Sequence, residues 1–80
     1  MKLYFLNRKG KEFLVSECKT VQEVFSRIKD QSIKSGLKSM YIRFWEENGR
    51  IRIDYGSWAE FFFVEGISIE EWLRDLGCVS

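Results

Sequence analysis

The chain has 80 residues, with thirteen basic and twelve acidic side chains, no histidine and no proline. A chain of this length holds one small hydrophobic core, which excludes a second domain or a deep enclosed cleft. Its hydrophobic fraction of 45% excludes intrinsic disorder, because that much apolar surface can offset the entropy lost on ordering. The sequence therefore predicts one folded domain over residues 1–80.

The missing residue types narrow the function. Without histidine, the commonest general base and metal ligand are lacking. Cys18 and Cys78 lie far apart without CxxC spacing, so we expect no enzyme, no metal site and no cofactor. The chain shows no signal peptide and no apolar run that could span a membrane, and we expect a cytoplasmic protein with two reduced thiols. A disulfide between the two cysteines stays open.

The first third of the chain predicts a hairpin followed by a helix. Residues 3–6 and 13–15 read as strands around a turn in which Gly10 supplies a positive φ. From residue 20 the apolar period becomes helical, and one stripe comprises Val21, Val24, Phe25 and Ile28. Thr20 and Glu23 have the spacing of a capping box, and Gly36 is a natural stop. We expect a helix over residues 20–35.

The middle of the chain predicts a second hairpin. Residues 40–46 and 50–55 flank Asn48-Gly49, which suits the two positive φ angles of a type I′ turn. This two-residue loop sets the register, which pairs Glu47 with Arg50, Trp45 with Arg52, Phe44 with Ile53, Arg43 with Asp54 and Ile42 with Tyr55. One face then carries Ile42, Phe44, Ile51 and Ile53 toward the first helix, and the other carries Tyr41, Arg43, Trp45, Arg52 and Asp54.

Residues 58–64 predict a third strand of this meander, after a tight turn at Gly56-Ser57. Its register is open, and we prefer the one that buries Ala59, Phe61 and Phe63. Phe62 would then lie on the opposite face and need a cover. Two covers stay open: the C-terminal helix with Trp72 and Leu73 as a lid, or a protein partner such as a second copy of the chain.

The chain ends with a predicted helix over residues 68–76. Ser68 and Glu71 repeat the capping-box spacing, Ile67 and Trp72 have the spacing of a hydrophobic staple, and Gly77 ends the helix. The resulting order, β-β-α-β-β-β-α, defines an α+β fold in which the helix over residues 20–35 packs on one face of an antiparallel sheet.

The outward face of the central hairpin is the candidate functional surface. Its aromatic and arginine side chains suit either anchors for a protein partner or a stacking platform for single-stranded nucleic acid. The same face could instead satisfy itself, with Trp45 against Arg52 and Arg43 paired with Asp54. A net charge of +1 gives no overall field toward nucleic acid. The partner-binding candidates are Tyr41, Arg43, Trp45, Arg52, Trp58 and Phe62.

Three segments give the chain its overall pattern: Met-Lys-Leu-Tyr-Phe at residues 1–5, Glu-Asn-Gly-Arg-Ile-Arg-Ile-Asp at 47–54, and the aromatic segment at 56–63. With its small size, this pattern resembles small uncharacterised proteins of phages and prophages of low-GC Gram-positive bacteria. The resemblance implies a setting in the host cytoplasm, where many such proteins bind and block a host enzyme or defence system. It includes no motif of known mechanism, so it assigns no functional residue.

The sequence thus predicts a non-enzymatic protein-binding module, encoded by a phage, that inhibits or modulates a host or defence protein. A homodimer is a further possibility for the same aromatic surface. The alternative is a single-stranded nucleic-acid or nucleotide binder that uses the same aromatic and arginine face, and it ranks below the protein partner.

Overall fold

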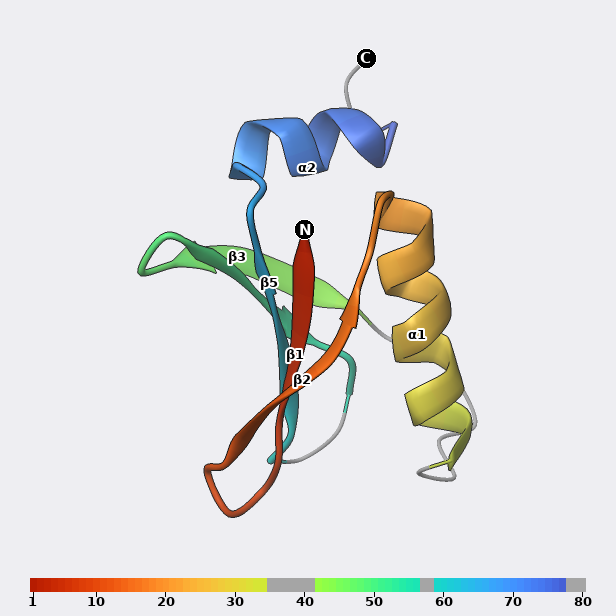
Figure 1. Cartoon of the computed structure of the whole chain (residues 1–80), viewed down its shortest axis with the longest axis vertical. Coiled ribbons are helices and arrows are strands. Elements are labelled where there is room, and N and C mark those ends of the chain that lie inside the picture. Colours follow the sequence, from red (N-terminus) through yellow and green to blue (C-terminus); the bar gives the residue numbers. More distant parts are fainter. Residues whose placement is uncertain (35–41, 57–58, 78–80) are drawn as a thin grey trace.

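The computed structural model describes residues 1–34, 42–56 and 59–77, and the chain forms the predicted β-β-α-β-β-β-α order of an α+β fold. Figure 1 shows α1 packed along one face of the sheet and α2 lying across one end of the molecule. The elements are β1 (Lys2–Leu6), β2 (Glu12–Glu17), α1 (Val21–Lys34), β3 (Arg43–Glu47), β4 (Arg50–Asp54), β5 (Phe61–Glu65) and α2 (Ile69–Asp75).

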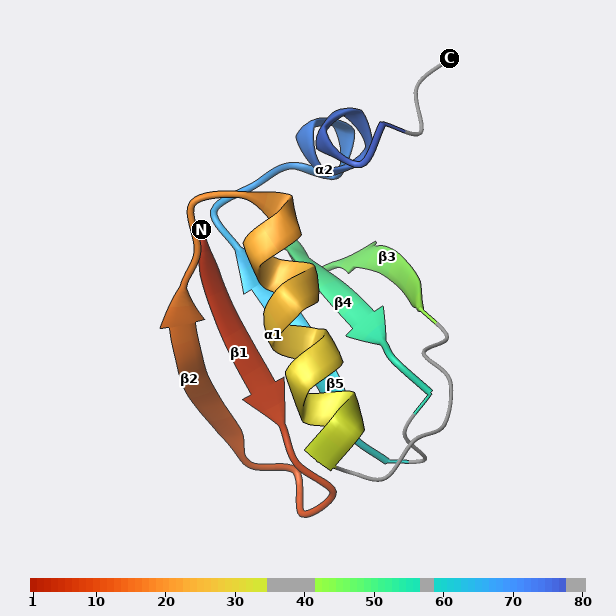
Figure 2. The same cartoon turned by 90° about the vertical axis from the view of Figure 1, so that its right-hand side faces the viewer.

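The five strands form one antiparallel sheet in the order β2-β1-β5-β4-β3. The N-terminal hairpin therefore joins the central meander through β1, which pairs with β5 from Lys2 opposite Glu65 to Leu6 opposite Phe61. In Figure 2, α1 crosses in front of the middle of the sheet and leaves β2 and β3 at its two edges.

The register predicted for the β3–β4 hairpin is confirmed over the paired residues. Glu47 lies opposite Arg50, and Trp45 lies opposite Arg52. Asn48 has a φ of 53° and Gly49 a φ of 77°, as a type I′ turn requires. The predicted pair of Ile42 with Tyr55 falls outside the register of the two strands, and Tyr41 lies outside the described residues.

The two helices begin at the predicted caps. Thr20 Oγ1 accepts a hydrogen bond from the Glu23 backbone N–H at 3.1 Å, and Ser68 Oγ accepts one from the Glu71 N–H at the same distance. Each bond satisfies an N–H that has no partner within its own helix. The predicted stop of the first helix, Gly36, lies outside the described residues.

The hydrophobic core lies between α1 and the face of the sheet that α1 covers. We call this the helix face, and the opposite one the outer face. Tyr55 and Trp72 are the largest side chains in the core. The fully buried core side chains are Leu3, Cys18, Val21, Val24, Ile28, Ile51, Ile53, Tyr55, Phe62, Val64 and Trp72.

The preferred register of the third meander strand is wrong. Ile53 pairs with Phe62 and Ile51 with Val64, so Phe62 faces α1, whereas Phe61 and Phe63 lie on the outer face. The connection after β4 is longer than the expected tight turn, because β5 begins only at Phe61. A loop of that length does not fix which side chains of the next strand point inward.

The C-terminal helix does not cover the outer face, so the lid interpretation is also wrong. The Trp72 ring lies 5.5 Å from the ring centroid of Phe25 in α1 and 5.7 Å from that of Phe44 in β3. Both partners belong to the core on the helix face. The helix α2 therefore closes one end of that core, which is the end at which it lies in Figure 1.

Candidate binding surface

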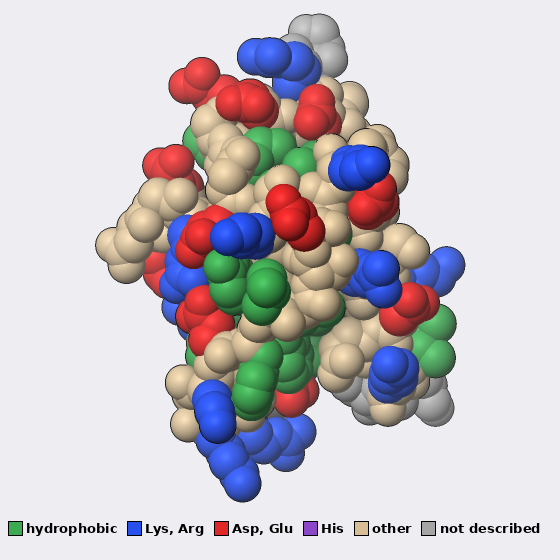
Figure 3. Space-filling view, viewed as in Figure 1, with side chains coloured by type: hydrophobic (Ala, Val, Ile, Leu, Met, Phe, Trp, Pro, Cys, Tyr) green, Lys and Arg blue, Asp and Glu red, His purple; other side chains and the backbone are tan. Residues whose placement is uncertain are grey.

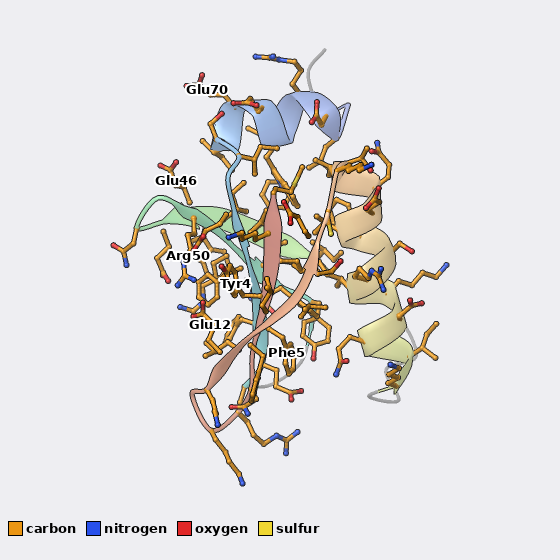
Figure 4. All side chains as sticks on the ribbon, in the orientation of Figure 1. Tyr4, Phe5, Glu12, Glu46, Arg50 and Glu70 are labelled. Carbon is orange, nitrogen blue, oxygen red and sulfur yellow. The ribbon has the colours of Figure 1, made fainter. Side chains whose placement is uncertain are left out.

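The outer face is built by the strand positions that alternate with the core. Trp45 in β3, Arg52 in β4, Phe63 in β5 and Tyr4 in β1 form one row across the sheet, in this order and on the same face. Figure 4 shows Tyr4, Glu12 and Arg50 gathered on the side of the sheet away from α1, while Phe5 lies on the α1 side. No helix of the described chain covers this face, so side chains of the strands must shield its aromatic rings.

Arg52 is the central cation of the outer face. Its guanidinium carbon lies 4.2 Å from the ring centroid of Phe61, 5.4 Å from that of Phe63 and 6.0 Å from that of Trp45. Its Nη1 donates a hydrogen bond to Glu47 Oε2 at 2.9 Å. The planar guanidinium can stack on rings while its edge binds a carboxylate. Arg52 therefore covers the aromatic rings and keeps its own charge paired.

Arg50 provides the second cover. Its guanidinium carbon lies 4.2 Å from the Phe63 ring centroid, and its Nη1 and Nη2 contact the two carboxylate oxygens of Glu12 at 2.5 Å and 3.4 Å. Glu65 Oε2 lies 3.9 Å from Nη1. The hydrogen bond to Glu12 is the largest of the effects that raise the pKa of Arg50. Because Glu12 belongs to β2, this bridge passes over both β1 and β5.

The two arginines explain why an outer-face phenylalanine is buried. Phe63 is 4% exposed, although it points away from α1. The outer-face phenylalanines Phe61 and Phe63 are thus covered by arginine side chains of the same sheet.

We expect Arg50→Ala to lower the free energy of unfolding by about 1–2 kcal/mol. The change uncovers Phe63 and so removes a partly desolvated cation–π contact. It also removes the bridge to Glu12, which is a surface ion pair. Chemical denaturation measures the effect. Arg50→Lys is the matched control: it keeps the charge but lacks the planar fork, so it should restore only part of the stability. An alanine variant as stable as the wild type would contradict the covering role.

The Glu47 carboxylate should make stability depend on pH in the acid range. The hydrogen bond from Arg52 is the main cause that lowers the pKa of Glu47 below its ordinary 4.5, and the charges of Arg52 and Arg50 lower it further. The ionised form therefore favours the folded state above pH 4.5, and this contribution is lost as the pH falls through the lower, folded-state pKa. Glu47→Gln should destabilise the protein at neutral pH, and its urea midpoint should approach that of the wild type in acid. A difference that is constant with pH would contradict this role.

Arg43 and Trp45 form the outermost part of the same face. Arg43 Nη2 lies 3.0 Å from Asp54 Oδ2, and Asp54 Oδ1 accepts the backbone N–H of Gly56 at 3.0 Å. Trp45 keeps 38% of its surface exposed beside Arg52. Both contacts expected of a self-satisfied face, Trp45 with Arg52 and Arg43 with Asp54, are present.

The predicted site residues divide into three groups. Arg43, Trp45 and Arg52 lie together on the outer face, as the hairpin register predicts. Tyr41 and Trp58 lie outside the described residues. The prediction that Phe62 belongs to the partner-binding surface is wrong. Phe62 is 1% exposed in the core, and its ring centroid lies 5.2 Å from that of Phe5 and 5.1 Å from that of Tyr55. It is buried as expected, but within its own chain, and it cannot anchor a partner on the outer face.

Sequence reasoning missed Arg50, Phe63 and Glu12 as parts of this surface. A signal existed for Arg50, because the predicted register already placed it two positions from Arg52 on the same face. Phe63 was assigned to the wrong face with the rest of its strand. Glu12 had no signal, since its contact with Arg50 depends on the order of the strands.

A second exposed apolar region lies at the β2 edge of the sheet. Phe13 and Val15 line a groove of about 330 Å³ between the first hairpin and α1, together with Phe5, Arg27, Asp30, Gln31, Lys34 and Phe62. Figure 3 shows hydrophobic side chains at the surface among acidic and basic ones on this side of the molecule. The basic residues of the β1–β2 turn, Arg8, Lys9 and Lys11, are exposed next to this region.

Comparison with family models, with curated proteins and with solved structures found no match to this chain. Among the described residues, no group of three or more cysteine, aspartate or glutamate side chains could hold a metal ion. Cys18 is a buried free thiol, and Cys78 lies outside the described residues. No helix in the described part of the chain has the length and hydropathy needed to cross a membrane.

Proposed function

We propose that the chain is a non-enzymatic protein-binding module whose contact surface is the outer face around Trp45. The exposed Trp45 is the observation that carries this proposal. A half-exposed tryptophan at the edge of a sheet is a typical interface anchor, because it offers a large apolar area with few rotatable bonds. Arg43, whose side chain is 61% exposed, would orient the partner beside it.

The charge pairing of the outer face favours a protein over a phosphate backbone. Arg43 contacts Asp54, Arg50 contacts Glu12 and Glu65, and Arg52 contacts Glu47. A phosphate chain would have to displace these carboxylates or lie beside them, whereas a protein surface can complement both signs of charge. The nucleic-acid alternative is therefore the weaker one.

The class of partner follows from the resemblance to small phage and prophage proteins. We propose a host or defence-system protein in the bacterial cytoplasm, which the chain would inhibit or modulate by occupying its surface. The low exposure of Arg52 and Phe63 supports a preformed, rigid surface of this kind, because little ordering would be needed on binding.

The test is affinity capture from a lysate of a low-GC Gram-positive host, followed by measurement of the dissociation constant for the captured protein. We expect Trp45→Ala to weaken that binding by about 30-fold, as truncation of an interface anchor does. Ile33→Ala is the matched control, because Ile33 is an even more exposed apolar side chain on α1. Equal binding by the wild type and Trp45→Ala would contradict the proposed surface.

Salt dependence separates the two functions. Binding through phosphate contacts weakens steeply as salt rises, whereas an aromatic protein interface changes little. A bound single-stranded oligonucleotide whose affinity falls with salt and with Trp45→Ala would favour the alternative.

A further inference from the structure

The strand β2 is an open sheet edge with an apolar centre. Its consecutive residues Phe13, Leu14 and Val15 are 44%, 59% and 44% exposed. The other edge strand, β3, instead carries charged side chains at Arg43, Glu46 and Glu47. Edge strands of monomeric proteins are usually protected by charge, proline or irregular pairing, because their free backbone groups can bind another strand. The centre of β2 lacks the first two of these protections.

The backbone hydrogen bonds show which groups of β2 face the open edge. The Asn7 N–H donates to the Lys11 carbonyl at 2.9 Å, which makes this pair a hydrogen-bonded rung. Such rungs alternate in an antiparallel ladder, so Phe13, opposite Phe5, is also bonded toward β1. Glu12 and Leu14 therefore present their N–H and C=O groups outward.

We infer that β2 pairs with β2 of a second copy of this chain, antiparallel and centred on Phe13. The two Phe13 side chains then face each other across a close, non-hydrogen-bonded rung on the helix face. On either side, Glu12 pairs with Leu14 of the partner subunit, so that the outward backbone groups of both residues are used. The two sheets join into one, and an aromatic pair replaces two exposed rings.

The charges along β2 suit a second copy in this orientation. Lys9 and Lys11 lie in the turn just before the strand, whereas Glu17 lies at its end. Antiparallel pairing of identical strands brings the basic turn before each strand toward the Glu17 end of the other, just beyond the paired rungs. Parallel pairing would place like charges together.

The irregularity within β2 does not interrupt this pairing. Its register shift falls after Leu14, where Ser16 rather than Val15 lies opposite Leu3. Residues 12–14 pair regularly with β1, and these are the residues that the proposed rungs use. The bulge limits the length of the shared ladder to the first half of the strand, as bulges near sheet edges do.

The dimer is independent of the proposed function, because it uses β2 and the partner surface surrounds Trp45 in β3, at the opposite edge of the sheet. The inference can fail while partner binding persists, and the reverse also holds.

The experiment is sedimentation equilibrium of the full chain over the micromolar range. We expect the wild type to reach twice the 9.6 kDa chain mass. Phe13→Lys and Phe13→Glu should each weaken self-association at least about tenfold, because each places like charges opposite one another. An equimolar mixture of the two variants should restore a complex of twice the chain mass.

The Ile33→Lys variant is the matched control, since it makes the same change at an exposed apolar position of α1. It should leave self-association unchanged, and circular dichroism of every variant checks that the fold persists. A monomeric wild type would overturn the inference. So would a dimer that persists in both Phe13 variants, or variants that remain monomeric when mixed.

Discussion

Trp72→Ala is expected to lower the free energy of unfolding by about 3–5 kcal/mol, one of the two largest effects predicted here for truncation of a described side chain. Trp72 is fully buried and is the largest side chain of the core. It packs against Phe25 of α1 and Phe44 of β3, so it connects three elements at one end of the domain. Its removal leaves a cavity and detaches α2. For a domain this small, thermal unfolding should shift by well over ten degrees.

Trp72→Phe distinguishes packing from hydrogen bonding at this position. The described residues supply no acceptor for the Trp72 indole N–H, so phenylalanine removes a buried polar group that has no partner among them. We expect a loss of about 1–2 kcal/mol, mainly from the smaller ring. An alanine variant that melts with the wild type would contradict the position of α2.

The second large effect is expected at Phe62, and its comparison with Phe61 tests the register of β5. Phe62→Ala should cost about 3–5 kcal/mol, because Phe62 is 1% exposed and contacts the rings of Phe5 and Tyr55. Phe61→Ala should cost only about 1 kcal/mol, since Phe61 is half-buried and loses chiefly its contact with Arg52.

Both substitutions remove the same side chain from adjacent positions, so each serves as the control for the other. Denaturant unfolding of the two variants under identical conditions gives the difference directly. The register that we preferred from the sequence, with Phe61 in the core, requires the opposite order. A larger loss at Phe61 than at Phe62 would therefore overturn the observed pairing of Ile53 with Phe62.

The parts of the fold that were predictable depend on local signals. Asn48-Gly49 determines the turn geometry, and a two-residue loop leaves one register for the flanking strands, so Trp45 and Arg52 could be paired without the structure. Thr20 and Ser68 likewise mark helix starts, because each accepts a hydrogen bond from a backbone N–H only three residues further along the chain. The turn alone predicts that Arg43, Trp45 and Arg52 share one face of the hairpin.

The errors concern contacts that no local signal specifies. In β5, three consecutive phenylalanines carry no alternation, so periodicity could not tell which of them points inward. The long connection before Phe61 removed the constraint of a tight turn. The contact of Glu12 with Arg50 depends on the strand order, in which β1 lies between β2 and β5. The sequence around Trp72 likewise does not specify the face of the sheet on which this side chain packs. These arrangements depend on the packing of the whole core, and not on the sequence of any one segment.

The position of β1 beside β5 also determines when the domain can fold. Lys2 pairs with Glu65, so β1 can join the sheet only after two segments that lie far apart in the sequence have come together. Such distant pairings slow folding, because the loop entropy is lost before the contacts form. During synthesis the edge of β1 that pairs with β5 stays unpaired until β5 has been synthesised. Slow codons or pauses before residue 61 would prolong that interval, and with it the exposure of β1 to aggregation.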